Sequence, residues 1–317
     1  MANKEMRAVY AETLIELART DDRIMVVEAD LMKATGTTAF KAVFPDRAVD
    51  AGVAEADMVG VAAGLASEGK RPFAATFGCF ASRRAFDQFF LSCAYAQLAV
   101  KLVGTDPGVS AAFNGGTHMP FEDLAIMRTV PGLPIVEPSD PVSLAALVRE
   151  LAAYDGPAYV RLHRKGVAPI YPEGELFKLG KGKVLREGKD ALIVALGAIM
   201  VPEALRAAEL LKAQGIEAAV IDALSLRPLD SELILAYARA TGIVVTAENH
   251  QAEGGLGSAV AELLAELPAR SVHPRLARIG VQGLFGEVGT QDWLQKRFGL
   301  TAEAIAARVE TLAAERK

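Results

Sequence analysis

Short apolar runs alternate with longer segments of helical periodicity along the whole chain. Residues 55–67 illustrate the second type, because Met58, Ala62 and Leu65 recur at spacings of four and three and so predict a helix with one buried face. The runs that predict strands are 24–27, 47–50, 73–76, 100–104, 135–137 and 158–162 in the first half and 191–196, 218–221 and 243–246 in the second. Buried strands that alternate with helices are typical of parallel sheets. The sequence therefore predicts an α/β protein with mostly parallel sheets, each covered by helices on both faces.

Residues 165–183 interrupt this alternation, since proline and glycine break every period there and charged residues cluster. With 317 residues, the chain also exceeds the size at which one hydrophobic core usually stops growing. We therefore expect two consecutive domains, 1–168 and 186–317, joined by a linker at 169–185.

Composition and charge exclude several classes of protein. Hydrophobic residues make up 51% of the chain and charged residues 23%, as in ordinary folded proteins. The formal net charge of −5 and the lack of a Lys/Arg-rich run argue against a nucleic-acid partner. Apolar runs of about ten residues are too short to span a membrane, and the charged N-terminus does not resemble a signal peptide. With two separated cysteines and no metal-ligand cluster, a cytoplasmic protein with no metal site of its own is expected.

The second half offers two local signals. Pro202 is expected to open a helix that ends before Gly215, because proline suits the first helical turn. The glycine-rich loop 254–257 follows a predicted strand and could suggest a dinucleotide site. However, Val260 occupies the position of the third glycine, so a tight strand-to-helix turn is the favoured interpretation.

Two residues stand out as candidates for chemistry. His118 lies in the loop 114–120, whose glycines allow the backbone to approach a ligand closely. Glu55 follows a predicted strand and opens an Ala- and Gly-rich helix, where it is either a first-turn carboxylate that complements the helix dipole or a catalytic group. The remaining histidines, in contexts that favour structural hydrogen bonding, are His163, His250 and His273.

Five blocks of sequence follow one another in the first domain. They are Asp50-Ala-Gly52-Val-Ala-Glu55-Ala-Asp-Met58, Ala75-Thr76-Phe77-Gly-Cys-Phe80, Gly104-Thr-Asp106, Gly115-Gly-Thr-His118-Met-Pro120-Phe-Glu122, and Arg128 with Pro131 and Glu137-Pro-Ser-Asp140. The second domain adds Ala-Glu-Asn-His at 247–250 and Gly-Gly-Leu-Gly at 254–257. In this order and spacing, the blocks resemble the pyrimidine-binding and C-terminal domains of transketolases over essentially the whole chain.

One part of a transketolase is missing. The family binds the diphosphate of thiamine diphosphate and its metal through a domain with a GDG motif followed by asparagine, and this chain contains no GDG. The chain therefore resembles the C-terminal half of a transketolase encoded as a separate subunit. The resemblance implies thiamine diphosphate as cofactor, with the Mg²⁺ or Ca²⁺ ion held by an N-terminal partner subunit. It also implies a heterotetramer with a homodimer contact, since the family is two-fold symmetric and a shared cofactor lies at an interface.

The resemblance assigns four residues to the cofactor. Glu55 matches the glutamate that hydrogen-bonds the aminopyrimidine ring, through which the cofactor removes the proton of its own thiazolium carbon. Phe77 and Phe80 match the aromatic wall of the pyrimidine pocket, a role compatible with core packing. Arg83 stands where the family has a third aromatic residue.

Four further residues are assigned to the substrate. His118 matches a histidine that faces the sugar and exchanges protons with its oxygens. Arg164 matches the arginine that holds a substrate phosphate, although Arg161 and His163 lie close enough in sequence to compete for that assignment. Thr105 and Asn114 replace a histidine and an aspartate of the familiar enzymes, so the resemblance indicates the reaction type more firmly than the sugar.

We therefore expect an enzyme subunit that transfers a two-carbon ketol unit between a ketose and an aldose, both of them sugar phosphates in the familiar enzymes. Alternatives are the β subunit of a 2-oxoacid dehydrogenase decarboxylase, a fragment of a deoxyxylulose-phosphate synthase and a non-catalytic partner subunit. The presence of Glu55, Phe80 and His118 together argues against the last of these. The second domain offers no catalytic candidate, and a dimer contact is its expected role.

Overall fold

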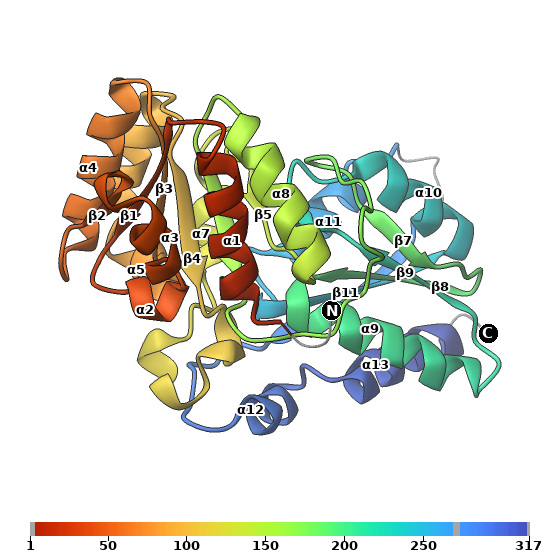
Figure 1. Cartoon of the computed structure of the whole chain (residues 1–317). Helices are drawn as coiled ribbons and strands as arrows, with labels where there is room; N and C mark the ends of the chain where they lie inside the picture. The colour runs from red at the N-terminus through yellow and green to blue at the C-terminus, as the bar shows by residue number, and fades with distance from the viewer. Residues whose placement is uncertain (1–3, 269–272, 316–317) are drawn as a thin grey trace.

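The computed structural model describes residues 4–268 and 273–315, which form two sheets flanked by helices (Figure 1). The strands are β1 (Ile24–Glu28), β2 (Ala48–Asp50), β3 (Arg71–Phe77), β4 (Lys101–Thr105), β5 (Ile135–Val136), β6 (Ala158–Leu162), β7 (Lys183–Arg186), β8 (Ala191–Leu196), β9 (Ala218–Asp222), β10 (Ser225–Arg227), β11 (Ile243–Gln251) and β12 (Arg275–Val281). The α-helices are α1 (Met6–Ala18), α2 (Met32–Thr35), α3 (Thr38–Val43), α4 (Glu55–Ser67), α5 (Gly78–Arg83), α6 (Phe86–Gln88), α7 (Asp123–Arg128), α8 (Pro141–Ala153), α9 (Gly197–Lys212), α10 (Ser231–Thr241), α11 (Leu256–Ala265), α12 (Gln291–Phe298) and α13 (Ala302–Ala314). Short 3₁₀ turns are η1 (Pro45–Arg47), η3 (Gly108–Asn114) and η4 (Gly116–His118), and η2 (Phe89–Tyr95) is a π-helix.

The two sheets are almost entirely parallel. The first has the strand order β10-β5-β6-β4-β3-β1-β2, and the second has the order β12-β11-β8-β9-β7. The antiparallel pairs, β10 with β5 and β7 with β9, lie at sheet edges. Central strands such as β1, β8 and β9 are buried at every residue, which explains why they appear in the sequence as continuous apolar runs. The predicted α/β fold with two mostly parallel sheets is confirmed.

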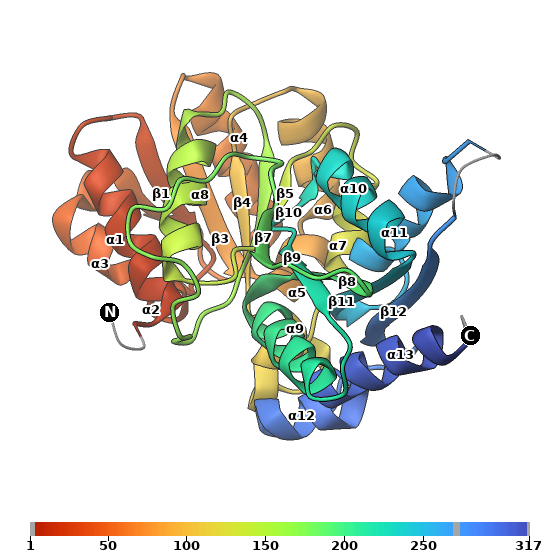
Figure 2. The ribbon, with the colours of Figure 1, turned by 90° about the vertical axis from the view of Figure 1, so that its right-hand side faces the viewer.

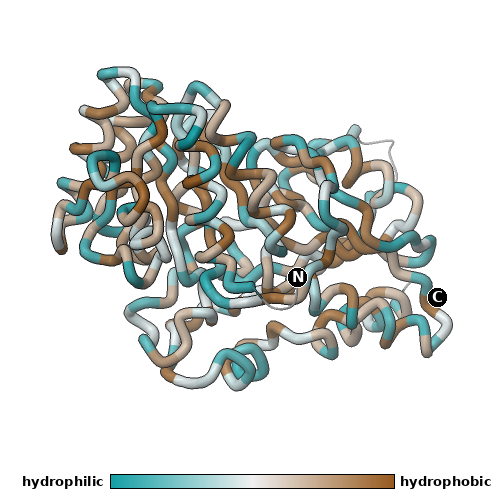
Figure 3. Tube along the Cα trace, in the orientation of Figure 1, coloured by the Kyte–Doolittle hydropathy of each residue, from teal (hydrophilic) through white to brown (hydrophobic). Residues whose placement is uncertain are grey.

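Helices cover both faces of each sheet. On the first sheet, α1, α3 and α8 pack on one face, and α4, α5, α7 and η2 pack on the other. On the second sheet, α10 and α11 cover one face, whereas α9, α12 and α13 gather on the opposite one (Figure 2). Hydrophobic segments follow the inner strands, while α12 at the periphery is largely hydrophilic (Figure 3). Within the described ranges, no helix is both long and apolar enough to cross a bilayer.

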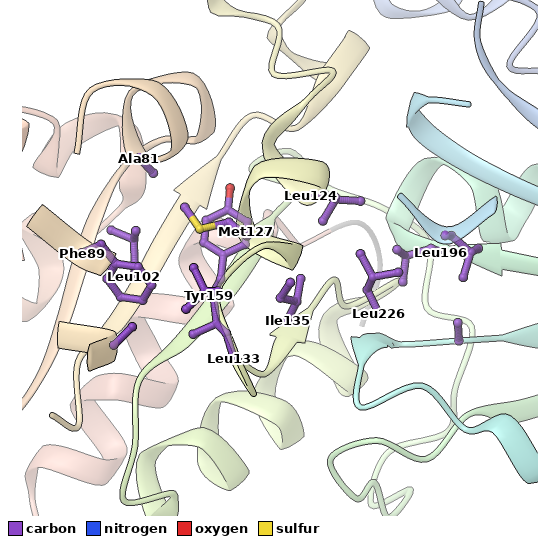
Figure 4. Packing of buried hydrophobic residues seen from close by; sticks show 14 of the residues in the cluster. Ala81, Phe89, Leu102, Leu124, Met127, Leu133, Ile135, Tyr159, Leu196 and Leu226 are labelled. Atoms are coloured by element: carbon purple, nitrogen blue, oxygen red, sulfur yellow. The ribbon is translucent and has the colours of Figure 1, made fainter. Parts of the chain in front are cut away.

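One hydrophobic cluster runs through both halves of the chain. Leu124, Met127 and Ile135 from the first half belong to the same buried cluster as Leu196 and Leu226 from the second (Figure 4). The two sheets therefore share a core across their junction, and the second half can hold parts of the first half in place.

The strand β10 is one difference from the sequence prediction. It belongs to the second half of the chain, yet it pairs with β5 and extends the first sheet. Three residues are too few to show a period, which is why the strand was not predicted. Arg227 anchors it further by donating hydrogen bonds to the backbone carbonyls of Arg128 and Val130, 2.8 and 2.6 Å away.

The linker is also more ordered than its composition indicates. Its last predicted residues, from Lys183, already belong to β7. The backbone N–H groups of Ile170 and Tyr171 donate to Asp140 at 2.9 and 3.0 Å, and the Tyr171 hydroxyl donates to Asp222 at 2.8 Å. The segment is thus fixed to both halves, while the boundaries at 168 and 186 stay a prediction.

The prediction that Pro202 opens a helix is wrong. The helix α9 begins at Gly197, so Pro202 lies inside it, where it removes one hydrogen bond of the helical ladder. The residues from Ala198 to Val201 are all buried, and their packing offsets the unfavourable proline.

The turn predicted at the glycine loop is confirmed. Gly254 has a positive φ of 82°, and α11 begins two residues later. The carboxylate of Glu248 accepts hydrogen bonds from the N–H groups of Leu256 and Gly257, both at 2.7 Å. A side chain of the protein itself therefore occupies the helix N-terminus that a dinucleotide phosphate would need.

Candidate functional site

The predicted site residues gather at one edge of the first sheet, where its parallel strands end. Phe77 is the last residue of β3 and Thr105 the last of β4, and the two are paired across the sheet. Glu55 opens α4 shortly after β2 ends, and Arg164 lies two residues beyond β6. Ligands of parallel α/β sheets bind outside the carboxyl ends of the strands. The fold therefore brings these residues to the edge where a ligand is expected.

Glu55 is an acidic group of this edge. It is 8% exposed, although it carries a carboxylate. With Asp57 it supplies negative charge to the first turn of α4, which stabilises the helix. Among residues 4–268 and 273–315, no side chain or backbone group donates a hydrogen bond to the Glu55 carboxylate. The oxygens are not enclosed by the protein, since they are absent from the buried atoms that lack a partner, so they are available for a ligand.

Three aromatic rings cluster nearby. The ring centroids of Phe77 and Phe80 are 6.1 Å apart, and His118 packs edge-on against both, at 6.1 and 5.3 Å. All three side chains are half-buried. The Nδ1 atom of His118 lies 2.9 Å from the hydroxyl of Thr117. The rings thus form an aromatic surface on which a flat ligand can pack, with a titratable imidazole at its border.

Arg164 provides a positive charge at the same edge, and this charge is held in place by a carboxylate of the protein. Its Nε lies 3.1 Å from a carboxylate oxygen of Asp106, and its guanidinium lies 5.7 Å from the centroid of Phe77. Asp106 is buried, which raises the pKa of its carboxyl group. The hydroxyl of Thr105 donates to Asp106 at 3.2 Å, and Thr105 is fully buried. Thr105 can therefore influence the site only through its hydrogen bond to Asp106.

Arg83 and Asn114 are placed differently. The Nε of Arg83 forms an ion pair with Glu122 at 2.7 Å, and both side chains are about 40% exposed. Asn114 is exposed at the end of η3, in the loop that leads to His118. Both residues therefore lie at the rim of the site, and Arg83 is already held by a protein carboxylate.

A buried polar cluster behind the site was not predicted. Arg161 is fully enclosed and donates to Asp123 at 2.9 Å and to Glu137 at 3.1 and 3.2 Å. The hydroxyl of Tyr159 also donates to Asp123, at 2.8 Å. Burial raises the pKa of Glu137 to about 7, against the opposing effect of Arg161. Arg161 is thus a structural group that no substrate reaches, whereas Arg164 is the accessible arginine.

The sequence contained one signal for this cluster. Arg161 stands inside the apolar run of β6, and a charge in a fully buried strand must have buried partners. Its partners could not be identified, because they come from other elements of the fold. Among the described residues, no group of three or more His, Cys, Asp or Glu side chains is arranged to hold a metal ion.

Comparison with protein families agrees with this geometry. The family model for the transketolase pyrimidine binding domain matches residues 2–169, and the model for the transketolase C-terminal domain matches residues 180–305. The chain belongs to the transketolase family. Over nearly its whole length it aligns with proteins that are subunits of split transketolases, so it corresponds to the C-terminal part of a split transketolase.

Three relatives illustrate the match. The chain is 51% identical over 300 residues to the 6-deoxy-6-sulfo-D-fructose transketolase subunit SqwH of Clostridium sp. (strain MSTE9), covering 95% of this chain and 92% of that one. It is 42% identical to a putative transketolase C-terminal section of Methanocaldococcus jannaschii, covering 96% and 95%. A solved split-gene transketolase, an inactive beta4 tetramer, aligns with a TM-score of 0.89 at 43% identity over 98% of both chains. These relatives support a transketolase rather than a 2-oxoacid dehydrogenase subunit.

Transketolases depend on thiamine diphosphate, and the site fits one half of this cofactor. Glu55 offers a nearly buried carboxylate without a protein partner, and Phe77 and Phe80 offer a partly exposed aromatic surface at the same sheet edge. An aminopyrimidine ring needs a flat apolar surface and a hydrogen-bonding group at its edge. The residues present therefore suit the pyrimidine.

Proposed function

We propose that this transketolase subunit binds the aminopyrimidine of thiamine diphosphate and the reacting sugar at the carboxyl edge of its first sheet. The observation that carries the proposal is Glu55, a residue that is 8% exposed as a whole and whose carboxylate has no partner among the residues described. In this proposal an N-terminal subunit holds the diphosphate and its Mg²⁺ or Ca²⁺ ion.

Each residue of the cofactor side has one task. When bound, thiamine diphosphate supplies the carbon nucleophile that carries the two-carbon unit from the ketose to the aldose. A Glu55 carboxyl oxygen hydrogen-bonds a nitrogen of the pyrimidine ring and so orients the ring. Phe77 and Phe80 pack against the ring and exclude water from it, which strengthens that hydrogen bond. Arg83, paired with Glu122, borders the pocket.

The substrate side consists of an imidazole and a guanidinium. His118 uses Nδ1 toward Thr117, so its Nε2 is the atom that exchanges a proton with a sugar oxygen. Arg164 pairs with the anionic end of the sugar, and Asn114 at the rim contacts its hydroxyl groups. A phosphate and a sulfonate both suit a guanidinium, and the relative from Clostridium is named for a sulfonated sugar. We therefore propose an anionic ketose as donor, with Thr105 acting through Asp106.

A site shared between subunits accounts for uncovered apolar side chains close to it. Val53 lies two residues before Glu55 and is 80% exposed, and Phe113 precedes Asn114 and is 73% exposed. Burial of these two side chains against a partner subunit would remove apolar surface from water. We propose a heterotetramer of two unlike pairs with a homodimer contact between copies of this chain.

Reconstitution tests this proposal. The chain is mixed with a partner polypeptide that carries a GDG motif followed by asparagine, with thiamine diphosphate and Mg²⁺, and ketol transfer is assayed with phosphorylated and sulfonated ketoses. Transfer is expected in the mixture and not with either polypeptide alone, and EDTA is expected to abolish it. Tight, metal-dependent binding of thiamine diphosphate to this chain alone, measured by calorimetry, would contradict the split site.

A further inference from the structure

The segment 107–121, here called the site loop, connects β4 to α7 and carries Asn114 and His118. Its regular structure consists of two short 3₁₀ turns. Inside the first, Ala112 has a φ of 48° and a ψ of −115°, a strained conformation for a residue with a side chain. Such strain persists when the surroundings determine the backbone conformation. The conformation of the site loop is therefore determined by contacts with other parts of the chain.

The beginning of the site loop is fixed by Asn249, in the strand β11 of the second sheet. The amide of Asn249 donates from Nδ2 to the carbonyl of Pro107 at 2.8 Å and accepts at Oδ1 from the N–H of Val109 at 3.0 Å. Between these two residues, Gly108 has a positive φ of 49°, and a Cβ there would overlap the Asn249 side chain. Asn249 is 1% exposed, so both ends of its amide are committed to the loop in a buried environment.

The end of the site loop is fixed by the same strand. The N–H of Gln251 donates to the carbonyl of Phe121 at 2.9 Å. Arg161 donates from one nitrogen to two carbonyls, those of Pro120 and Asn249, both at 2.9 Å. Strand β11 therefore holds the loop at its two ends, on either side of His118.

The middle of the site loop packs against a second segment of the second half, residues 283–288. Gly116 lies so close to Gly286 that a Cβ on Gly116 would overlap the Gly286 carbonyl. Gln251 joins this segment to β11, because its side chain donates to the Leu284 carbonyl at 2.8 Å and accepts from the Gly283 N–H at 3.0 Å. In Figure 1 the loop after β4 accordingly lies beside the chain that leads to α12.

We propose that Asn249 is a positioning residue for His118, and that the second half of this chain shapes the sugar site rather than only forming subunit contacts. The inference rests on the proposed function, in which His118 exchanges a proton with the sugar. The two hydrogen bonds of Asn249 fix the position of the start of the loop. A displacement of about 1 Å in a reacting group can lower the rate about 100-fold. Its amide provides both the donor and the acceptor that the strained turn requires.

The first test compares Asn249→Ala with a matched control. Glu203→Ala also removes a nearly buried side chain of the second half that accepts a backbone hydrogen bond, from Ala302 at 2.7 Å, and it does not contact the loop. In the two-subunit enzyme, Asn249→Ala is expected to lower kcat about 10- to 100-fold, while Glu203→Ala keeps the wild-type kcat. Asn249→Asp, which keeps the acceptor for Val109, is expected to lie between Asn249→Ala and the wild type.

A double-mutant cycle shows whether Asn249 acts through His118. If it does, adding Asn249→Ala to His118→Ala slows the enzyme by no more than about twofold, because residues that act as a unit are not additive. If the two rate losses multiply, or if Asn249→Ala alone has the wild-type kcat, the proposal is overturned.

Hydrogen exchange provides a readout that does not depend on activity. In this chain by itself, Asn249→Ala is expected to accelerate amide exchange across 107–121 at least about tenfold, and Glu203→Ala is expected to leave it unchanged. Unchanged exchange in Asn249→Ala refutes the positioning role, whether or not the protein is active. A wild-type pair without ketol transfer would instead refute the proposed function.

Discussion

Replacing Arg161 by methionine is expected to destabilise the chain more than most core substitutions. The guanidinium is fully buried and neutralises Asp123 and Glu137, and it also donates to the carbonyls of Pro120 and Asn249. Methionine fills part of the space but leaves two carboxylates without a counter-charge and two carbonyls without a donor. The variant therefore isolates the electrostatic contribution of one side chain.

The magnitude follows from the burial. Removing one partner of a buried ion pair costs about 3–5 kcal/mol, because the remaining charge stays in a medium of low dielectric. Each buried carbonyl that loses its donor adds about 1–3 kcal/mol. Protonation limits the total, since burial already raises the pKa of Glu137 to about 7 and loss of the guanidinium raises it further. We expect a loss of about 4 kcal/mol at pH 7.5, or roughly 6 °C in Tm for a chain of this length.

The assay is thermal unfolding followed by circular dichroism at pH 7.5 and pH 5.5. Arg149→Met is the control, because the ion pair of Arg149 with Glu16 is 44% and 62% exposed and is worth less than about 1 kcal/mol. The loss in Arg161→Met should be smaller at pH 5.5, because there Glu137 is protonated in the folded state of both wild type and variant, so the guanidinium no longer neutralises it. A melting temperature within 2 °C of wild type at pH 7.5 would refute the reasoning, as would an equal loss at both values of pH.

Two further substitutions test the surroundings of the site. Burial lowers the pKa of His250 to about 4, and its Nδ1 lies 2.9 Å from the carbonyl of Gln251. As the pH falls below about 6.5, the unfolded chain therefore takes up a proton at His250 while the folded state keeps the ring neutral. Between pH 7.5 and pH 5, wild type should therefore lose about 2 kcal/mol more stability in urea than His250→Gln, and parallel losses would contradict this account. Ala112→Gly should raise the free energy of unfolding by about 1 kcal/mol, because glycine accepts the positive φ of 48° without strain, and a lower urea midpoint would show that the turn is not strained.

The sequence predicted the architecture because the central strands are buried on both faces. Runs such as Ala191–Leu196 are apolar without interruption, and that pattern identifies a parallel sheet before any contact is known. The errors arose where tertiary contacts override local preference. Pro202 lies inside α9 because the preceding turn is buried. The strand β10 forms because it pairs with the edge strand β5.

The candidate site was predicted residue by residue through family resemblance, and the structure brings Glu55, Phe77 and His118 to one edge of the sheet. The roles of these residues remain predictions. The polar groups behind the site could not be found in this way. The hydrogen bond from Val109 to Asn249 joins residues 140 positions apart, and no local pattern marks such a pair. From the sequence the second domain offers no catalytic candidate, and its contact with the site loop follows only from the fold.

The central claim is tested most directly by Glu55→Gln beside Asp57→Asn in the two-subunit enzyme. Both substitutions remove one negative charge from the first turn of α4, so their effects on the helix are alike, but Asp57 is exposed and Glu55 is not. The account predicts that Glu55→Gln lowers kcat for ketol transfer at least about 100-fold, while Asp57→Asn stays within about twofold of wild type. Equal rates for the two variants would contradict the assignment of Glu55 to the cofactor.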